Sequence, residues 1–155
     1  MKYTTIAILK YNKYTIDEKK AFLCKGDFMG CLIVSNNPMV KEKFDNVYFI
    51  ESTSRELLEK VRNLVHSGSE LITHPLGVSL RMIYSPSFTV VINKKEGKLN
   101  SLHSKIIETS IEKYDLHMGA GLREEDVKNS KDYSVIDYKL LESALVEINS
   151  NAMSF

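Results

Sequence analysis

Four short apolar runs along the chain predict β-strands. They are rich in β-branched and aromatic residues, which favour strands, and polar or turn-forming residues lie between them. The runs cover residues 32–34, 47–50, 70–75 and 88–92. A further run near the amino terminus, TTIAILKY, suggests an added strand.

Segments with helical periodicity lie between several of these runs. The clearest helix follows Thr53 and Glu56, which have the spacing of a capping box, and it ends before Gly68, where a left-handed residue is expected. Its apolar residues repeat at i, i+1, i+4, i+7 and i+8, which places them on one face. These residues are Leu57, Leu58, Val61, Leu64 and Val65.

Three more helices are expected after residue 30, besides a short helix near the amino terminus that Thr15 and Glu18 cap. A short helix begins at Pro38 with Asn37 as its N-cap, because proline is favoured at the first helical position and asparagine just before it. A second long helix covers residues 99–114. Asp137 is placed as the cap of the last helix, whose apolar stripe is formed by Leu140, Leu141, Ala144, Leu145 and Ile148.

Alternation of strands and helices predicts right-handed crossovers and parallel strands. We therefore expect a single three-layer α/β domain over residues 1–155, with a mainly parallel sheet of four or five strands flanked by helices. Its expected parts are an N-terminal extension (1–30), a core (31–115), a loop (116–136) and a C-terminal helix (137–149).

Composition agrees with a globular protein. The 155 residues are 43% hydrophobic and 26% charged, and the net charge is +1. Proteins that bind nucleic acid usually carry a basic excess or a basic stripe, which this chain lacks. Its apolar runs are too short for a leader or a membrane span. We expect a cytoplasmic protein that binds neither nucleic acid nor membrane.

Sequence motifs for metals and cofactors are missing. Cys24 and Cys31 form no CxxC pair, so two isolated thiols are favoured over a disulfide or a metal site. The four histidines share no helical or strand spacing, and no P-loop, GxGxxG or HExxH motif is present. We expect no cofactor and no metal.

Polar residues follow the predicted strands. Ser35, Asn36 and Asn37 follow the first strand, Glu51 the second and His74 the third. In a parallel sheet the carboxyl ends of the strands gather at one edge, where ligands bind. The helix N-termini at this edge favour a small carboxylate or phosphate.

The segment THPLGVSLR after the third strand has the composition of a binding loop. His74 ends the strand, Gly77 permits a close approach of the backbone, Ser79 carries a hydroxyl, and Arg81 offers a planar cationic fork. The alternative is a rigid turn in which His74 satisfies a nearby carbonyl, Asn37 only caps a helix and Arg81 is solvated.

The segments VSNNPMVKEKF, VYFIESTSRELLEKVRNLVHSGSELITHPL and DYSVIDYKLLESAL together resemble the GrdX family. These small proteins are encoded beside the glycine, sarcosine and betaine reductase genes of amino-acid-fermenting anaerobes. The resemblance runs from about Ile33 to Leu145. The chain departs from the family pattern after Leu76, where VSLRM replaces Gly-Ser-Val-Lys-Pro, and in residues 1–30.

The resemblance implies a non-catalytic accessory or ligand-sensing protein of the glycine reductase system. In this hypothesis Ser35, Asn36, Asn37 and the 74–81 segment hold a small anionic metabolite or contact a glycine, sarcosine or betaine reductase subunit. One alternative is a small enzyme in which His74 is the general acid or base and Glu51 orients it. Another is an interaction module that forms a homodimer.

Overall fold

A computed structural model describes residues 31–76 and 80–152 of the chain. The strands are β1 (Cys31–Ser35), β2 (Val47–Phe49), β3 (Glu70–Leu71) and β4 (Thr89–Asn93). The α-helices are α3 (Pro38–Lys43), α4 (Ser54–His66), α5 (Ser101–His117) and α6 (Ser130–Ala152). Two 3-10 helices are η1 (Leu80–Tyr84) and η2 (Val127–Asn129). The run TTIAILKY and the short helix expected at Thr15 lie outside the described residues.

The four strands form one mixed sheet in the order β2-β1-β4-β3. β1 and β2 are parallel, with Ile33 beside Val47, whereas β4 is antiparallel to both β1 and β3. The expectation of a mainly parallel sheet is therefore wrong. Parallel neighbours need a long crossover, usually a helix. The described part of the β3–β4 connection holds only η1, and β4 begins at the end of the sheet where β3 finishes.

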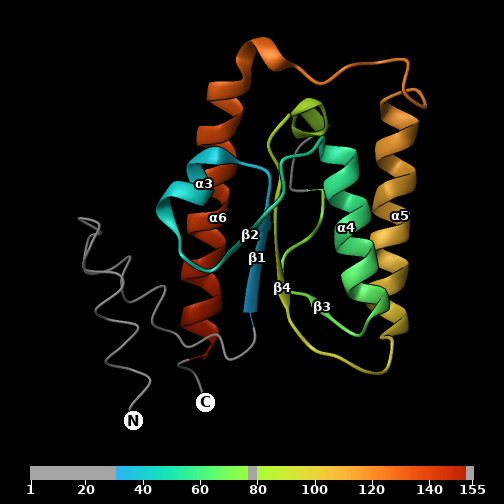
Figure 1. Cartoon of the computed structure of the whole chain (residues 1–155), viewed down its shortest axis with the longest axis vertical. Coiled ribbons are helices and arrows are strands. Elements are labelled where there is room, and N and C mark those ends of the chain that lie inside the picture. Colours follow the sequence, from blue (N-terminus) through green and yellow to red (C-terminus); the bar gives the residue numbers. More distant parts are fainter. Residues whose placement is uncertain (1–30, 77–79, 153–155) are drawn as a thin grey trace.

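Helices pack against the sheet through two apolar clusters. Val34, Val90 and Ile92 belong to the cluster that contains side chains of α4 and α5, whereas Ile33 and Val91 belong to the cluster with α3 and α6. Adjacent residues of a strand point to opposite faces, which explains this alternation. Figure 1 shows α3 and α6 on one side of the strands and α4 and α5 on the other.

The expected start of α3 and both expected ends of α4 are confirmed. Asn37 accepts a hydrogen bond from the Met39 N–H and caps α3, and Thr53 and Glu56 form the complete capping box of α4. Gly68 has a φ of 108° just beyond the end of α4. A Cβ atom at Gly68 would lie 2.8 Å from the backbone nitrogen of Gly97, so the position needs glycine for space as well as for conformation.

The last helix begins earlier than expected. α6 starts at Ser130, directly after η2, and Asp126 caps η2 by accepting a hydrogen bond from the Asn129 N–H. Asp137 is therefore inside α6 and does not cap it. Its carboxylate turns toward α3 and β4 and makes tertiary contacts instead of capping its own helix.

No helix within the described ranges combines the length and the apolar character needed to cross a bilayer. The single-domain organisation of the whole chain stays a prediction, because residues 1–30 lie outside the described part.

Candidate functional site

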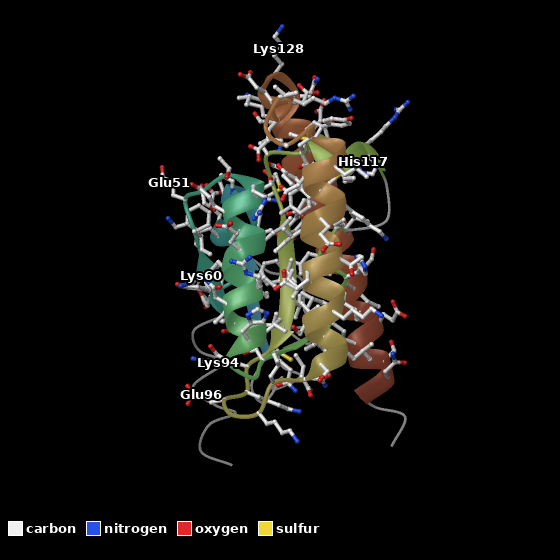
Figure 2. All side chains as sticks on the ribbon, turned by 90° about the vertical axis from the view of Figure 1, so that its right-hand side faces the viewer. Glu51, Lys60, Lys94, Glu96, His117 and Lys128 are labelled. Carbon is white, nitrogen blue, oxygen red and sulfur yellow. The ribbon has the colours of Figure 1, made fainter. Side chains whose placement is uncertain are left out.

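The sheet directions bring three strand ends together. β1 is parallel to β2, and both β1 and β3 are antiparallel to β4, so β1, β2 and β3 run in one direction. Their carboxyl ends therefore lie at the same end of the sheet, where β4 begins. Figure 2 agrees, because Glu51, after β2, and Lys94, after β4, lie toward opposite ends of the molecule.

The side chain of Asn36 joins neighbouring segments at this end of the sheet through hydrogen bonds. Its side-chain nitrogen donates to the carbonyls of Ser52 and Pro86, both at 3.0 Å, and its side-chain oxygen accepts from the Phe88 N–H at 2.7 Å. The buried amide thus joins three segments of the chain. These contacts engage both ends of the amide, so Asn36 supports the architecture of the site.

Asn37 joins α3 to α6. Its side-chain oxygen caps α3, while its side-chain nitrogen donates to the Ser134 carbonyl at 2.9 Å and to Asp137 Oδ2 at 2.8 Å. The residue is fully buried. Asn37 is therefore both a helix cap and a hydrogen-bond donor to a buried carboxylate.

A chain of polar groups continues from Asp137 into the sheet. The Thr89 hydroxyl donates to Asp137 Oδ2 at 2.6 Å and lies 2.7 Å from Ser35 Oγ. Ser35 Oγ in turn accepts from the Asn37 N–H at 3.0 Å. The network links β1, β4, α3 and α6, and the predicted residues Ser35 and Asn37 belong to it.

The Asp137 carboxyl has an unusual proton affinity. Burial raises its pKa to about 6 from an ordinary value of 3.8, although hydrogen bonds from Thr89 and Asn37 act in the opposite direction. Desolvation disfavours the charged form of a carboxyl group, and donors that face it favour that form. Asp137 therefore changes its charge in a mildly acidic range.

Asp137 lines a cavity of about 310 Å³ between α6, the segment after β3 and the start of β4. This volume is at the lower end of the range typical of small-ligand sites. The polar lining residues are Thr73, His74, Ser87, Thr89 and Asp137, and the apolar ones are Pro75, Leu76, Met82, Phe88, Leu140, Leu141 and Ala144. This described lining contains no lysine and no arginine.

His74 stands at one wall of the cavity. Its Nδ1 accepts a hydrogen bond of 3.2 Å from the Leu76 N–H, so the neutral ring carries its proton on Nε2. Burial lowers the pKa of His74, and the positive charge of Lys113 lowers it further. The imidazole is therefore held neutral near pH 7, as a hydrogen-bond donor.

The other predicted residues lie elsewhere. Among the described strands, β2 and β3 lie at the two edges of the sheet, so about 14 Å separates the strands that precede Glu51 and His74. Glu51 is exposed at the margin of the molecule (Figure 2). This placement does not bring Glu51 beside His74. Arg81 is exposed and does not line the cavity, while Gly77 and Ser79 lie outside the described residues.

The sequence prediction missed Asp137 as a site residue because it assigned this aspartate to a helix cap. One signal was available, since Asp137 shares its helix face with Leu141, Ala144 and Leu145, at i+4, i+7 and i+8. A carboxylate on the inward face of an amphipathic helix indicates a buried polar contact. Thr89 gave no such signal, because threonine is common in strands.

Metal ligation finds no support among residues 31–76 and 80–152, where no three His, Cys, Asp or Glu side chains gather into a binding group. The cavity can instead offer hydrogen-bond donors and acceptors, one titratable carboxyl group and an apolar wall.

The described residues thus form an α/β protein with a mixed four-stranded sheet and a cavity of small-ligand size between α6, the segment after β3 and the start of β4. Ser35, Asn36 and Asn37 do not line this cavity. The GrdX-like protein family matches residues 32–146, and the chain belongs to this family. No curated protein and no solved structure matches the chain.

Proposed function

We propose that this chain is an accessory protein of the glycine reductase system that binds a small molecule in the cavity between α6 and the end of β3. Membership of the GrdX-like family supports the association with glycine reductase genes. The observation that carries the binding role is the cavity itself, where His74 and the titratable Asp137 interrupt a mostly apolar lining. Pockets that combine apolar walls with a few converging polar groups are typical of ligand sites.

The charge of the cavity lining argues against the anionic ligand that the helix N-termini led us to expect. Asp137 supplies negative charge when ionised, and His74 is held neutral. Arg81, the cation expected to hold the anion, is not part of the lining. The cavity therefore favours a small molecule without net negative charge. The proposed protein partner is still a reductase subunit, whose binding to this chain would depend on the small molecule in the cavity.

The test is a thermal-shift screen of the full chain with glycine, sarcosine, betaine, acetyl phosphate and small amines. A compound at 100 times its dissociation constant adds about 2.7 kcal/mol to the free energy of unfolding, which raises the Tm by roughly 5–10 °C for a chain of this size. We expect the shift to disappear in Ala144→Leu, because the larger side chain fills the cavity, and to persist in Glu51→Gln.

The accessory role has its own test. Immobilised protein, with and without the stabilising compound, is incubated with purified reductase subunits, and retention is measured. Retention that depends on the compound supports a sensor of the reductase system. A stabilising compound that the purified chain converts to product would instead establish an enzyme, and shifts that survive Ala144→Leu would remove the cavity as the binding site.

A further inference from the structure

Within residues 31–76 and 80–152, the Asp137 carboxylate has no cationic partner. Within the described residues its contacts are hydrogen bonds from neutral groups, namely the Thr89 hydroxyl, the Thr89 backbone and the Asn37 amide. Buried carboxylates are normally paired with a cation or bound to a metal, because an isolated buried charge is costly. The positive charge that would complete this site is missing from the part of the chain that the structure describes.

The geometry leaves room for such a partner on the cavity side. Asp137 lines the cavity, and both side-chain hydrogen bonds to its carboxylate end on Oδ2. A carboxylate oxygen has two lone pairs, so Oδ1 retains acceptor capacity. A donor that enters the cavity can therefore bind Asp137 without displacing Thr89 or Asn37.

The other residues of the cavity lining determine which chemical groups the rest of the ligand can carry. Leu76, Met82 and Leu141 contribute apolar wall, and no lysine or arginine belongs to the described lining. An ammonium group gains the attraction of Asp137, whereas a carboxylate or phosphate meets repulsion from it. The hydrocarbon part of an amine is suited to the apolar side of the cavity.

We propose that the cavity binds a small alkylammonium ion whose N–H groups pair with Asp137 and whose hydrocarbon chain packs against Leu76, Met82 and Leu141. This inference rests on the proposed function and specifies the ligand class of the same site. His74, with its proton on Nε2, donates to a second, uncharged acceptor on a ligand that carries one.

The experiment compares three probes of one chain length, n-butylammonium, 1-butanol and butyrate, by calorimetric titration of the full chain at pH 7.5. We expect n-butylammonium to bind most tightly and butyrate most weakly. In Asp137→Asn the affinity for n-butylammonium falls tenfold or more, because a charge-assisted hydrogen bond is lost, while the affinity for 1-butanol changes little. Glu147→Gln removes an exposed carboxylate from the same helix and leaves all three affinities unchanged.

The Ala144→Leu variant distinguishes failure of this inference from failure of the proposed function. If 1-butanol or butyrate binds at least as tightly as n-butylammonium, and Ala144→Leu abolishes that binding, the cation inference is overturned and the cavity remains a ligand site. If n-butylammonium binds but Asp137→Asn does not weaken it, the inference is also overturned. Absence of binding by all three probes, together with a negative compound screen, overturns both proposals.

A pH series provides a second readout if Asp137→Asn does not fold, as judged by circular dichroism. In the wild type, n-butylammonium affinity should fall as the pH drops through 6, because protonation removes the charge that binds it. His74 is the other titratable group in the lining, so the series is repeated in His74→Ala. A pH-independent affinity in both proteins would overturn the inference.

Discussion

Asn37 and Asp137, separated by 100 residues in the chain, are joined by a buried hydrogen bond of 2.8 Å from Asn37 Nδ2 to Asp137 Oδ2. The same asparagine caps α3 with its other side-chain atom. One amide therefore fixes the start of α3 against α6 and supplies a donor to the carboxylate of the cavity. Local helix capping and the candidate site depend on one side chain.

We predict that Asn37→Ala destabilises the protein by about 2–4 kcal/mol. The loss of an N-cap costs about 1 kcal/mol, and a buried carboxylate that loses a donor adds roughly 1–3 kcal/mol. Asn100→Ala is the matched control, because Asn100 caps α5 at a half-buried position away from the cavity. Urea unfolding of both variants measures the difference, and equal losses would contradict the role assigned to the Asn37–Asp137 bond.

The second prediction concerns pH. The pKa of Asp137 is raised by burial to about 6 in the folded protein, against 3.8 for an ordinary aspartate. Between these values the folded chain binds more protons than the unfolded chain, so the contribution of Asp137 to stability is complete below about pH 3.8 and is lost as the pH rises through 6. The size of the effect is on the order of 3 kcal/mol.

The measurement is the free energy of unfolding of the wild type minus that of Asp137→Asn, taken from pH 7.5 to pH 4.5, so that other titrating groups cancel. The difference should move in favour of the wild type as the pH falls. A difference that is constant over this range would show that the Asp137 carboxyl is not desolvated in the folded protein.

A third prediction concerns His74. Burial lowers its pKa, and Lys113 on α5 lowers it further through its positive charge. Lys113→Met should therefore raise the pKa of His74, because the imidazolium form loses a repulsive neighbour. Lys105→Met, at another exposed position of α5, is the control. Proton-detected NMR titration of the imidazole reads the pKa, and equal values in the two variants would exclude the influence of Lys113.

The fourth prediction compares two glycines with positive φ. A Cβ at Gly68 would lie 2.8 Å from the Gly97 backbone nitrogen, whereas a Cβ at Gly121 meets nothing within 4 Å. Both alanine variants bear the cost of a left-handed backbone, about 1–2 kcal/mol. Gly68→Ala should lose more stability than Gly121→Ala, because the Gly97 segment must also shift. Thermal unfolding ranks the two, and the reverse order would contradict the close approach.

Helix boundaries set by neighbouring residues were predictable. The capping box of Thr53 and Glu56 and the Asn37–Pro38 start of α3 involve side chains within a few residues of the backbone they stabilise. The end of α4 depends on the positive φ of Gly68, which is also a local property. Such local features can be predicted from the spacing of residues in the sequence, and the structure confirms them. The apolar runs also located the four strands, because burial selects β-branched residues. The third strand is shorter than expected, since β3 covers only Glu70–Leu71 of the expected 70–75.

The direction of β4 and the raised pKa of Asp137 were not predictable from local patterns. An apolar strand pairs equally well in either direction as far as its own residues are concerned. The described part of the connection between β3 and β4, residues 72–76 and 80–88, holds η1 but no crossover α-helix, and β4 runs back along β3. Likewise, Asp137 has a side chain suited to capping a helix. Only the packing of α6 against α3 and β4 turned it into a buried carboxylate with a raised pKa, because desolvation depends on segments that are distant in the chain.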